Sequence, residues 1–365
     1  MRMSDVQRPP DPKRALAHAL ASGDLADQHY LGRSIAWRGQ PQRLLRNGQR
    51  LVTQLFRYRC EPEPERPEVG IIARYARGDD YHTQLKVAMQ AFGESLRRQH
   101  GSSLRFRAVT DSAPVHERHL AWTQGGGWFG RQSSIIHPDF GAASLIAELV
   151  VDQDLELEHK APHPDRCGSC RACVQVCPTE AIAPEGYRVD SRRCISYWTI
   201  EWNGLIPRWI MERMGRRVFG CDDCTVICPW NSKATAPVLE GLEPRTENLQ
   251  PRLLELLAYR DEDAFQRRFA GSPVLRAGAA GLCRNVLIGL ASLDSDAARA
   301  AIRRFCDQDA SPVVRATAYW AAHRQGLEVT KGLGDPDALV RGLVDELLRG
   351  EPSQPPSPPV SSRHF

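Results

Sequence analysis

Two stretches decide the fold of this chain: CGSCRACVQVCP, residues 167–178, and CDDCTVICP, residues 221–229. The first has the spacing C-x2-C-x2-C-x3-C-P, and the second repeats the last three cysteines and the proline of that run. Cys194, which lies between them, can replace the cysteine that the second stretch lacks. Three thiolates at this spacing wrap one four-iron cluster, while the cysteine before the proline points to a second cluster. The spacing therefore predicts two 4Fe-4S clusters.

Crossed ligation divides eight of the 11 cysteines into two predicted sets. One cluster is expected to be held by Cys167, Cys170, Cys173 and Cys228, and the other by Cys194, Cys221, Cys224 and Cys177. A pair of structural zinc sites is the alternative, but zinc needs no x3-C-P tail. The remaining cysteines are predicted to be small core residues: Cys60, Cys283 and Cys306.

The composition is that of a globular protein: 365 residues, 42% hydrophobic and 25% charged. No run approaches the ~18 apolar residues of a membrane span, and the first residues lack the apolar segment of a signal peptide. We therefore expect a cytoplasmic protein whose cysteines bind metal rather than form disulfides. The formal charge of +4 is too small to establish a nucleic-acid partner.

The chain is predicted to be an α+β multidomain protein. Residues 1–155 combine expected strands at Gly70–Tyr75 and Leu104–Val109 with an expected helix at Thr83–His100, which indicates an α/β domain. Residues 156–235 hold the cysteines and little else that could form a core, so metal is expected to stabilise them.

The last third is predicted to be helical. Residues 236–346 contain paired amphipathic patterns, and Asp309–Gly326 looks like a HEAT-type repeat in which Pro312 opens the second helix. Residues 347–365 are rich in proline and serine, which predicts a disordered tail.

Four motifs in this order resemble the epoxyqueuosine reductase family: RYARGDDYH (74–82), TDSAPVHER (110–118), RRCISYWTIE (192–201) and FGCDDCTVICPWN (219–231). The resemblance runs from about Arg38 to about Leu327. It implies a cobalamin-dependent reductase that removes the epoxide oxygen of epoxyqueuosine at the tRNA wobble position. It also implies an α/β cobalamin-binding domain, a ferredoxin-like two-cluster domain and HEAT-like helices that hold the tRNA.

The resemblance assigns the proton donor to Asp111, for which a helix N-cap is the alternative. Glu117 and Arg118 are interpreted as a structural ion pair. The implied cobalamin contacts are Arg38, Ala73, Arg74, Asp111, Ile135, Ser196, Cys221 and Asp222. The implied tRNA contacts are Arg276, Arg284, Asn285 and Arg315, within a wider set of arginines that includes Arg303, Arg304 and Arg324.

The sequence departs from the family after its glycine-rich loop, Trp122–Gly130, where Arg131 and Gln132 stand in place of lysine and asparagine. Arginine is bulkier than lysine, which puts the affinity for the corrinoid in question. The expected partners are the epoxyqueuosine-bearing anticodon stem-loop and an external electron donor, with no membrane, and a monomer is expected.

Two other functions are compatible with the cysteines. A two-cluster electron-transfer protein accounts only for the cysteine-bearing part and leaves RYARGDDYH and TDSAP unexplained. Another corrinoid reductase, such as a dehalogenase, has no evident use for the helices of the last third.

The cysteine pattern predicts a metal content. Protein prepared without oxygen should hold about eight iron atoms per chain, because eight thiolates serve two four-iron clusters. Cys194→Ala should remove one cluster and spare the other, as measured by iron analysis and electron paramagnetic resonance. Zinc without iron in the parent protein would contradict the cluster assignment.

Overall fold

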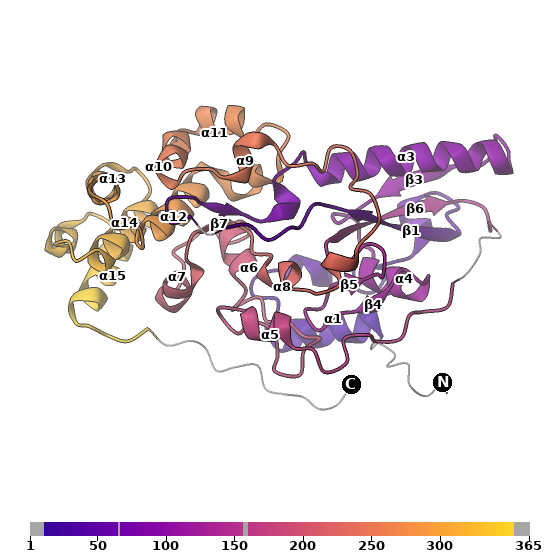
Figure 1. Cartoon of the computed structure of the whole chain (residues 1–365), viewed down its shortest axis with the longest axis horizontal. Coiled ribbons are helices and arrows are strands. Elements are labelled where there is room, and N and C mark those ends of the chain that lie inside the picture. Colours follow the sequence, from indigo (N-terminus) through magenta and orange to yellow (C-terminus); the bar gives the residue numbers. More distant parts are fainter. Residues whose placement is uncertain (1–10, 65, 156–159, 354–365) are drawn as a thin grey trace.

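The computed structural model describes residues 11–64, 66–155 and 160–353. The molecule is elongated (Figure 1): the N-terminal part with the long helix α3 lies at one end, the helices α13 to α15 lie at the other, and the short cysteine-bearing helices lie between them. Among the described residues, no helix combines the length and the apolar character needed to cross a membrane.

A three-stranded antiparallel sheet organises the N-terminal part. Its strands are β1 (Arg50–Arg57), β6 (Ser144–Val151) and β3 (Phe106–Val109), with β6 in the centre. Glu148 of β6 lies opposite Thr53 of β1 and Val109 of β3. The helices of this part are α1 (Pro12–Ala21), η2 (His29–Ser34), α2 (Pro41–Leu44), η3 (Arg74–Ala76), α3 (Tyr81–His100) and α4 (Glu117–Thr123).

The two faces of the sheet are covered by different helices. Leu85 and Met89 of α3 pack with Ala147 and Leu149 on one face. Helix α4 contacts β1 and β6. Because successive strand residues point to opposite faces, the even-numbered residues of β6 face α4.

The predicted elements of this part are confirmed in two cases. The expected strand at Leu104–Val109 is β3, and the expected helix is α3, which begins at Tyr81 because the Asp80 carboxylate caps it through the backbone N–H of His82. The prediction for Gly70–Tyr75 was wrong for most of its length. Only Ile71–Ile72 form a strand, β2, and this strand pairs in parallel with β7 (Arg217–Phe219) rather than joining the sheet.

The glycine-rich loop leads into a small hairpin of β4 (Trp128–Phe129) and β5 (Ile135–Ile136). Gly127 has a φ of +130°, and a Cβ there would lie 2.2 Å from the carbonyl oxygen of Ile136, so only glycine fits. Arg131 donates hydrogen bonds to the carbonyls of Gly168 and Glu185. The unusual arginine therefore attaches the hairpin to the first cysteine stretch.

The cysteine-bearing part contains α5 (Ala172–Val176), α6 (Ile195–Ile200), α7 (Arg208–Met214), α8 (Asp223–Val226) and η4 (Asn231–Lys233). The expectation that this part has little core was wrong. Trp209, Met211 and Phe219 belong to the largest hydrophobic core, which also contains Leu282 and Leu287 of helix α12. The second half of the cysteine-bearing part is thus continuous with the helical part.

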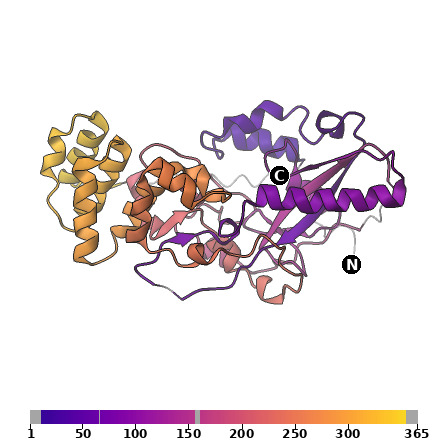
Figure 2. The same cartoon turned by 90° about the horizontal axis from the view of Figure 1, so that it is seen from above.

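The helical part follows the prediction in outline. Its helices are α9 (Thr246–Leu249), α10 (Leu253–Leu256), η5 (Leu257–Arg260), α11 (Glu262–Arg268), η6 (Pro273–Ala277), α12 (Gly278–Leu290), α13 (Asp296–Gln308), α14 (Pro312–Arg324), η7 (Thr330–Gly334) and α15 (Ala338–Leu348). Figure 2 shows the last helices stacked at one end of the molecule. Pro312 opens α14 as predicted, and the three remaining cysteines are buried as predicted. Most of the predicted tail, residues 354–365, lies outside the described residues.

Two of the expected tRNA contacts are core residues. Arg284 is 1% exposed and donates hydrogen bonds to the carbonyls of Trp198, Trp202 and Gly204. Asn285 is 0% exposed and donates to the carbonyls of Thr199 and Val218. The prediction that these side chains face the tRNA was wrong because α12 is covered on both sides, and its polar residues satisfy backbone carbonyls instead.

The role of Arg284 predicts a large stability loss on truncation. Arg284→Ala leaves three buried carbonyls without donors, and each orphaned group costs about 1–3 kcal/mol. Arg303→Ala, on the exposed side of α13, should change the free energy of unfolding by less than about 0.5 kcal/mol. Denaturant unfolding of the two variants checks this. Equal stabilities would contradict the structural role of the Arg284 hydrogen bonds.

Candidate functional site

The structure gathers the eight motif cysteines into two groups. Burial, together with the nearby Cys167, Cys173 and Cys170, raises the pKa of the Cys228 thiol to about 11. Burial also raises the pKa of the Cys224 thiol, and the nearby Cys221, Cys194 and Cys177 raise the same pKa to a smaller extent. Helices α5 and α8, which lie within the two motifs, pack against each other. Each group contains one cysteine from the opposite motif, which is the arrangement that crossed ligation requires.

The groups suit clusters better than single ions. Within the described part of the chain, no three side chains of His, Cys, Asp or Glu converge as the ligands of one metal ion would. Four thiolates around a four-iron cluster surround a larger body than one zinc ion. The donor set, four thiolates in each group, therefore fits 4Fe-4S clusters, and the ligand role of each cysteine stays a prediction.

Asp111 lies at the end of β3 in a left-handed backbone conformation, with a φ of +44°. Its Oδ2 accepts a hydrogen bond from the Tyr81 hydroxyl at 2.6 Å and lies 3.0 Å from His82 Nε2. The carboxylate is half exposed. Helix α4 begins only at Glu117, its N-cap residue is His116, and no side chain caps it. The alternative that Asp111 is a helix cap was therefore wrong.

The charges around Asp111 favour an ion pair. The hydrogen bond with His82 holds the pKa of Asp111 below its usual value, and the same bond raises the pKa of His82. Asp80 supports this from the other side, because its Oδ1 lies 2.7 Å from His82 Nδ1. The pair's stabilising contribution is lost in acid as pH falls through the lowered pKa of Asp111. In base it is lost as pH rises through the raised pKa of His82.

Glu117 does not form the predicted ion pair with Arg118. Its carboxylate turns back and accepts a hydrogen bond from the backbone N–H of Asp111, while Arg118 donates to the carbonyl of Ser133. Because the backbone of Asp111 adopts a strained conformation, a carboxylate that binds its N–H helps to hold the loop in place.

A cavity of about 380 Å³ lies beside Asp111. Tyr81 and His82 of α3 form one wall, Ser196 of α6 forms another, and Arg276 of η6 forms a third. Arg276 pairs with Glu201 at 2.8 Å across the cavity lining. All three parts of the fold thus contribute to one cavity, whose volume is within the usual range for a ligand site.

The expected cobalamin contacts are only partly at this cavity. Ser196 lines it, and Asp111 reaches it through Tyr81 and His82. Ala73 and Ile135 are 0% and 3% exposed, so the surrounding protein covers both side chains, and their contact with cobalamin stays a prediction.

The other expected positions bind the protein itself. Arg74 binds Asp222 through its backbone N–H at 2.6 Å and through Nη1 at 3.1 Å. Arg38 donates to the carbonyl of Val115. The cavity, which joins the cluster side to Asp111, fits the reacting part of a cofactor, but it does not enclose a whole corrinoid.

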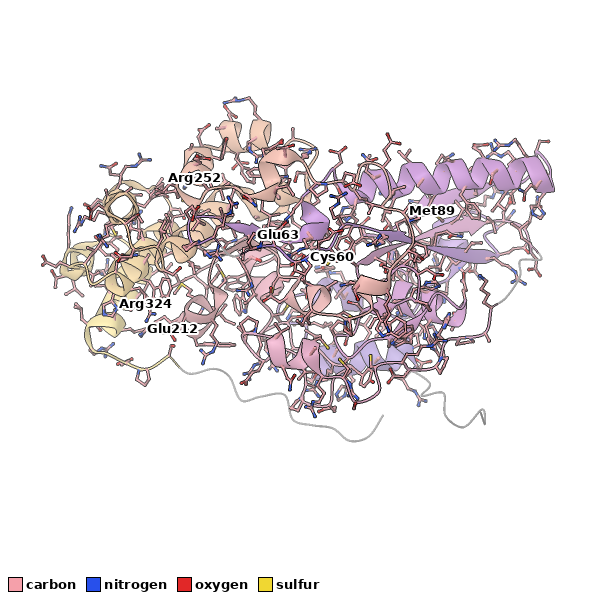
Figure 3. The ribbon with its side chains drawn as sticks, in the orientation of Figure 1. Cys60, Glu63, Met89, Glu212, Arg252 and Arg324 are labelled. Atoms are coloured by element: carbon pink, nitrogen blue, oxygen red, sulfur yellow. The ribbon has the colours of Figure 1, made fainter. Side chains whose placement is uncertain are left out.

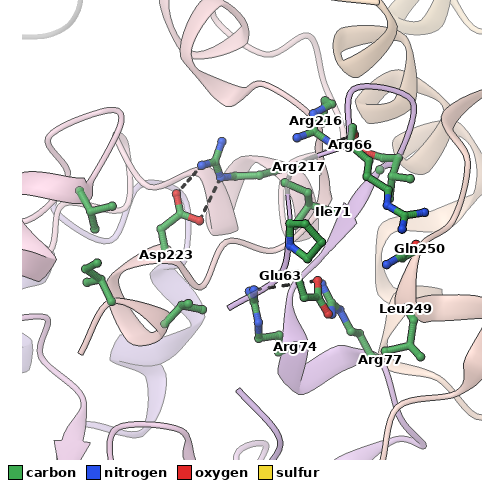
Figure 4. Close-up of a pocket in the computed structure, with 16 residues that line it drawn as sticks. Glu63, Arg66, Ile71, Arg74, Arg77, Arg216, Arg217, Asp223, Leu249 and Gln250 are labelled. Atoms are coloured by element: carbon green, nitrogen blue, oxygen red, sulfur yellow. Dashed lines mark hydrogen bonds and ion pairs between the residues drawn. The ribbon is translucent and has the colours of Figure 1, made fainter. Parts of the chain in front are cut away.

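A second cavity, of about 340 Å³, lies behind the second cysteine motif. Figure 4 shows the arginines of its lining together with apolar side chains such as Ile71 and Leu249: Arg66, Arg74, Arg77, Arg216 and Arg217. Arg217 pairs with Asp223, and Arg77 pairs with Glu63. Arg216 donates to backbone carbonyls. These charges are mostly balanced inside the protein, so the cavity offers little to an anionic ligand.

The remaining arginines divide by exposure. Arg315 makes two hydrogen bonds of 2.8 Å to Asp335, and its side chain is only 12% exposed, so its guanidinium is largely used inside the protein and its contact with tRNA stays a prediction. Arg303, Arg304 and Arg324 are exposed on α13 and α14, and Arg324 lies at the helical end of the molecule (Figure 3).

Sequence reasoning missed Tyr81 and His82 as members of the site. Both lie in the motif RYARGDDYH, and a signal was present: tyrosine and histidine directly after two aspartates, at the start of a helix. The loop that carries Asp111 is distant in sequence, so only the fold shows that the two segments meet.

The contact between His82 and Asp111 predicts a measurable pKa. In Asp111→Asn the negative partner is lost, so the pKa of His82 should fall toward its ordinary value of 6.5. Titration of the His82 imidazole by NMR, in parent and variant, checks this. An unchanged pKa would show that the two side chains do not interact in solution.

Comparisons with known proteins agree with the geometry. Residues 166–231 match the description "4Fe-4S double cluster binding domain", and residues 38–112 match "Epoxyqueuosine reductase QueG, DUF1730". A solved epoxyqueuosine reductase superposes with a TM-score of 0.80 and 26% identity over 92% of this chain and 91% of that one. Another, solved with an epoxyqueuosine-modified tRNA-Tyr stem loop, gives 0.83 and 25% identity over 94% of each chain.

Curated relatives extend over much of the chain. The epoxyqueuosine reductase of Escherichia coli K12 is 42% identical over 63% of this chain, and the aligned region spans 59% of that relative. The one from Alicycliphilus denitrificans is 35% identical over 83% of this chain and 88% of that relative. With this extent of similarity, the chain belongs to the epoxyqueuosine reductase family.

Proposed function

We propose that this chain is an oxidoreductase that converts epoxyqueuosine to queuosine at the wobble position of tRNA, with Asp111 as the proton donor. One observation carries the proposal: Asp111 is hydrogen-bonded to Tyr81 and His82, and these two residues line a cavity that Ser196, two residues after Cys194, lines as well. Proton delivery and electron supply therefore meet at the same place, as the reduction of an epoxide requires.

The two cysteine groups would carry electrons to this cavity. Cys170 is exposed, so we place electron entry from an external donor at the group that contains it. Cys194 and Cys221 of the other group adjoin the cavity residues Ser196 and Phe219. Cobalamin bound along the cavity, against Ser196, would supply a strongly reducing metal centre that no amino-acid side chain can provide.

The side chains on the opposite wall handle the proton. An alkoxide is a poor leaving group near neutral pH, so the epoxide oxygen needs an acid as its C–O bonds break. Asp111 is the group placed to donate, and the Tyr81 hydroxyl fixes the direction of its carboxyl group by donating a hydrogen bond to Oδ2. Because His82 favours the charged form of Asp111, the carboxylate must receive its proton from a neighbour before each transfer.

We further propose that the helical part holds the tRNA stem-loop in a HEAT-like array. Arg276 is half exposed and lines the cavity, and it could contact the nucleotide near the reacting base. Arg303, Arg304 and Arg324 are exposed and can meet phosphates. The shared fold with a reductase solved with such a stem loop supports this placement. The monomeric state, the cytoplasmic location and the domain limits at residues 155, 235 and 346 stay predictions.

An Asp111→Asn variant tests the proposed donor. An amide cannot donate an acidic proton, and losing general-acid assistance costs about 10² to 10⁴ in rate. The cofactor-loaded enzyme, chemically reduced, is mixed with an epoxyqueuosine stem-loop, and queuosine is followed by mass spectrometry in a single turnover. Asp263→Asn, an exposed aspartate on α11, is the matched control and should keep the parent rate.

Three outcomes are separable. A parent enzyme that forms no queuosine contradicts the proposed function. An Asp111→Asn enzyme that binds the stem-loop and reacts at the parent rate contradicts the role of Asp111 alone. A slow variant with intact cluster content and stem-loop binding supports both.

A further inference from the structure

Glu148 is a glutamate in the middle of the central strand β6, and it is 0% exposed. Within the described structure, neither of its carboxylate oxygens has a hydrogen-bond partner. Buried polar groups are nearly always paired, because an unpaired one costs about 1–3 kcal/mol. The position would be better occupied by an apolar residue such as its neighbours Ala147 and Leu149, so stability does not explain it.

The side chain of Glu148 lies on the face of the sheet that carries α4 and Glu117. Ala147 and Leu149 point toward α3, so Glu148 points to the other face, which α4 covers. Thr53 lies opposite it on β1, and the Thr53 hydroxyl is also buried without a partner. Glu117, the first residue of α4, lies over this face and binds the backbone N–H of Asp111.

The carboxyl groups of Glu148, Glu117 and Asp111 interact electrostatically. Burial raises the pKa of Glu148, and the charges of Glu117 and Asp111 raise it further. Burial and Asp111 likewise raise the pKa of Glu117. Two of the three groups can therefore hold a proton at a pH where a free carboxyl group has lost it.

The nearby cations do not reverse the rise in the pKa of Glu117. Arg118 and Arg38 lower the pKa of Glu117 but do not offset its burial. Burial lowers the pKa of His116 to about 4, and burial also lowers the pKa of His119, so both imidazoles are neutral near pH 7. No cation therefore offsets the burial and the carboxyl charges that raise the pKa of Glu148 among the causes that act on it.

The reaction requires two protons. An epoxide becomes an alkene and water when two electrons and two protons are added: both C–O bonds break, a C=C bond forms, and the oxygen leaves as water. Asp111 can hold only one proton at a time. A second proton must reach it before the oxygen can depart as water.

We propose that Glu117 and Glu148 form a proton store behind Asp111, with Glu148 as the reserve and Glu117 as the group that passes its proton on. This inference rests on the proposed function. Asp111 gives its proton to the epoxide oxygen as the first C–O bond breaks. Glu117 then protonates Asp111, and Glu148 protonates Glu117. Asp111 delivers the second proton, and solvent refills the store after water departs. The electrons come from the external one-electron donor through the clusters.

Glutamine distinguishes this role from a structural one. Glu148→Gln keeps the size and neutrality of the protonated acid but removes its proton. If Glu148 only fills space, the variant is equivalent to the parent. If it stores a proton, the variant folds normally and loses function. Glu240→Gln, at an exposed glutamate, is the matched control.

The first measurement needs neither substrate nor cobalamin. The infrared spectrum of the cluster-loaded protein at neutral pH should show the C=O band of a protonated carboxylic acid. Glu148→Gln should remove the part of this band that Glu148 contributes and leave the part from Glu117, whereas Glu240→Gln should leave the whole band unchanged. A parent protein without this band, or a band unchanged by Glu148→Gln, overturns the proposal whether or not the protein reduces epoxyqueuosine.

The second measurement is the single-turnover rate in mixtures of H₂O and D₂O. We expect Glu148→Gln to lower the rate about tenfold or more, toward the range of general-acid losses, with cluster content and stem-loop binding unchanged. The dependence on deuterium fraction should also become simpler, because fewer protons move.

The experiment must distinguish the loss of the proton store from the loss of the donor Asp111 and from a failure to fold. Glu117→Gln should give the same loss of rate. Glu117 is partly exposed, and glutamine keeps an oxygen that can accept the Asp111 N–H, so this variant covers the case in which Glu148→Gln fails to fold. A parent rate in the folded glutamine variants overturns the proposal while leaving the role of Asp111 intact.

Discussion

The contact between Arg74 and Asp222 determines where the clusters lie relative to the sheet. Asp222 directly follows Cys221, and Arg74 directly follows the segment that pairs with β7, so this pair joins the two regions next to a predicted cluster ligand. Buried ion pairs add little net stability, because desolvation offsets most of their attraction, but they can fix one arrangement among several. The close approach at this place supports that role: a Cβ on Gly220 would lie 2.7 Å from the Cβ of Ala73.

Around this contact, the polar residues of α12 act as an internal brace. Asn285 binds the carbonyls of Thr199 and Val218, and the Thr199 hydroxyl accepts the N–H of Gly220. The loop that carries Cys221 is therefore held from two sides, by the α/β part and by the helices. A cluster domain of this size would otherwise rely on its metal for stability, whereas here the shared apolar core supports its second half.

The sequence predicts the cluster region and the helices well because their signals are local. Cysteine spacing, the cap at Asp80 and the proline at the start of α14 each act within a few residues. It predicts the sheet poorly, because β1 and β6 are far apart in the chain and the glutamate in SLIAELVV interrupts the apolar pattern of β6. The errors at Arg284 and Asn285 have a similar origin. Helical periodicity assumes one solvent face, but ten of the thirteen residues of α12 are buried.

Two of the buried charged residues, Arg284 and Glu148, illustrate how the structure separates a supporting role from a chemical one. Arg284 is buried and its guanidinium is fully used by three carbonyls, so its position is explained by the packing that it stabilises. Glu148 is buried equally deeply, yet its oxygens bind nothing in the described structure and its neighbours are two further carboxyl groups. A protein gains no stability from such a group, and selection would replace it with an apolar side chain unless its proton were needed. Unsatisfied burial beside a proton donor is therefore better evidence for a catalytic role than burial or charge alone.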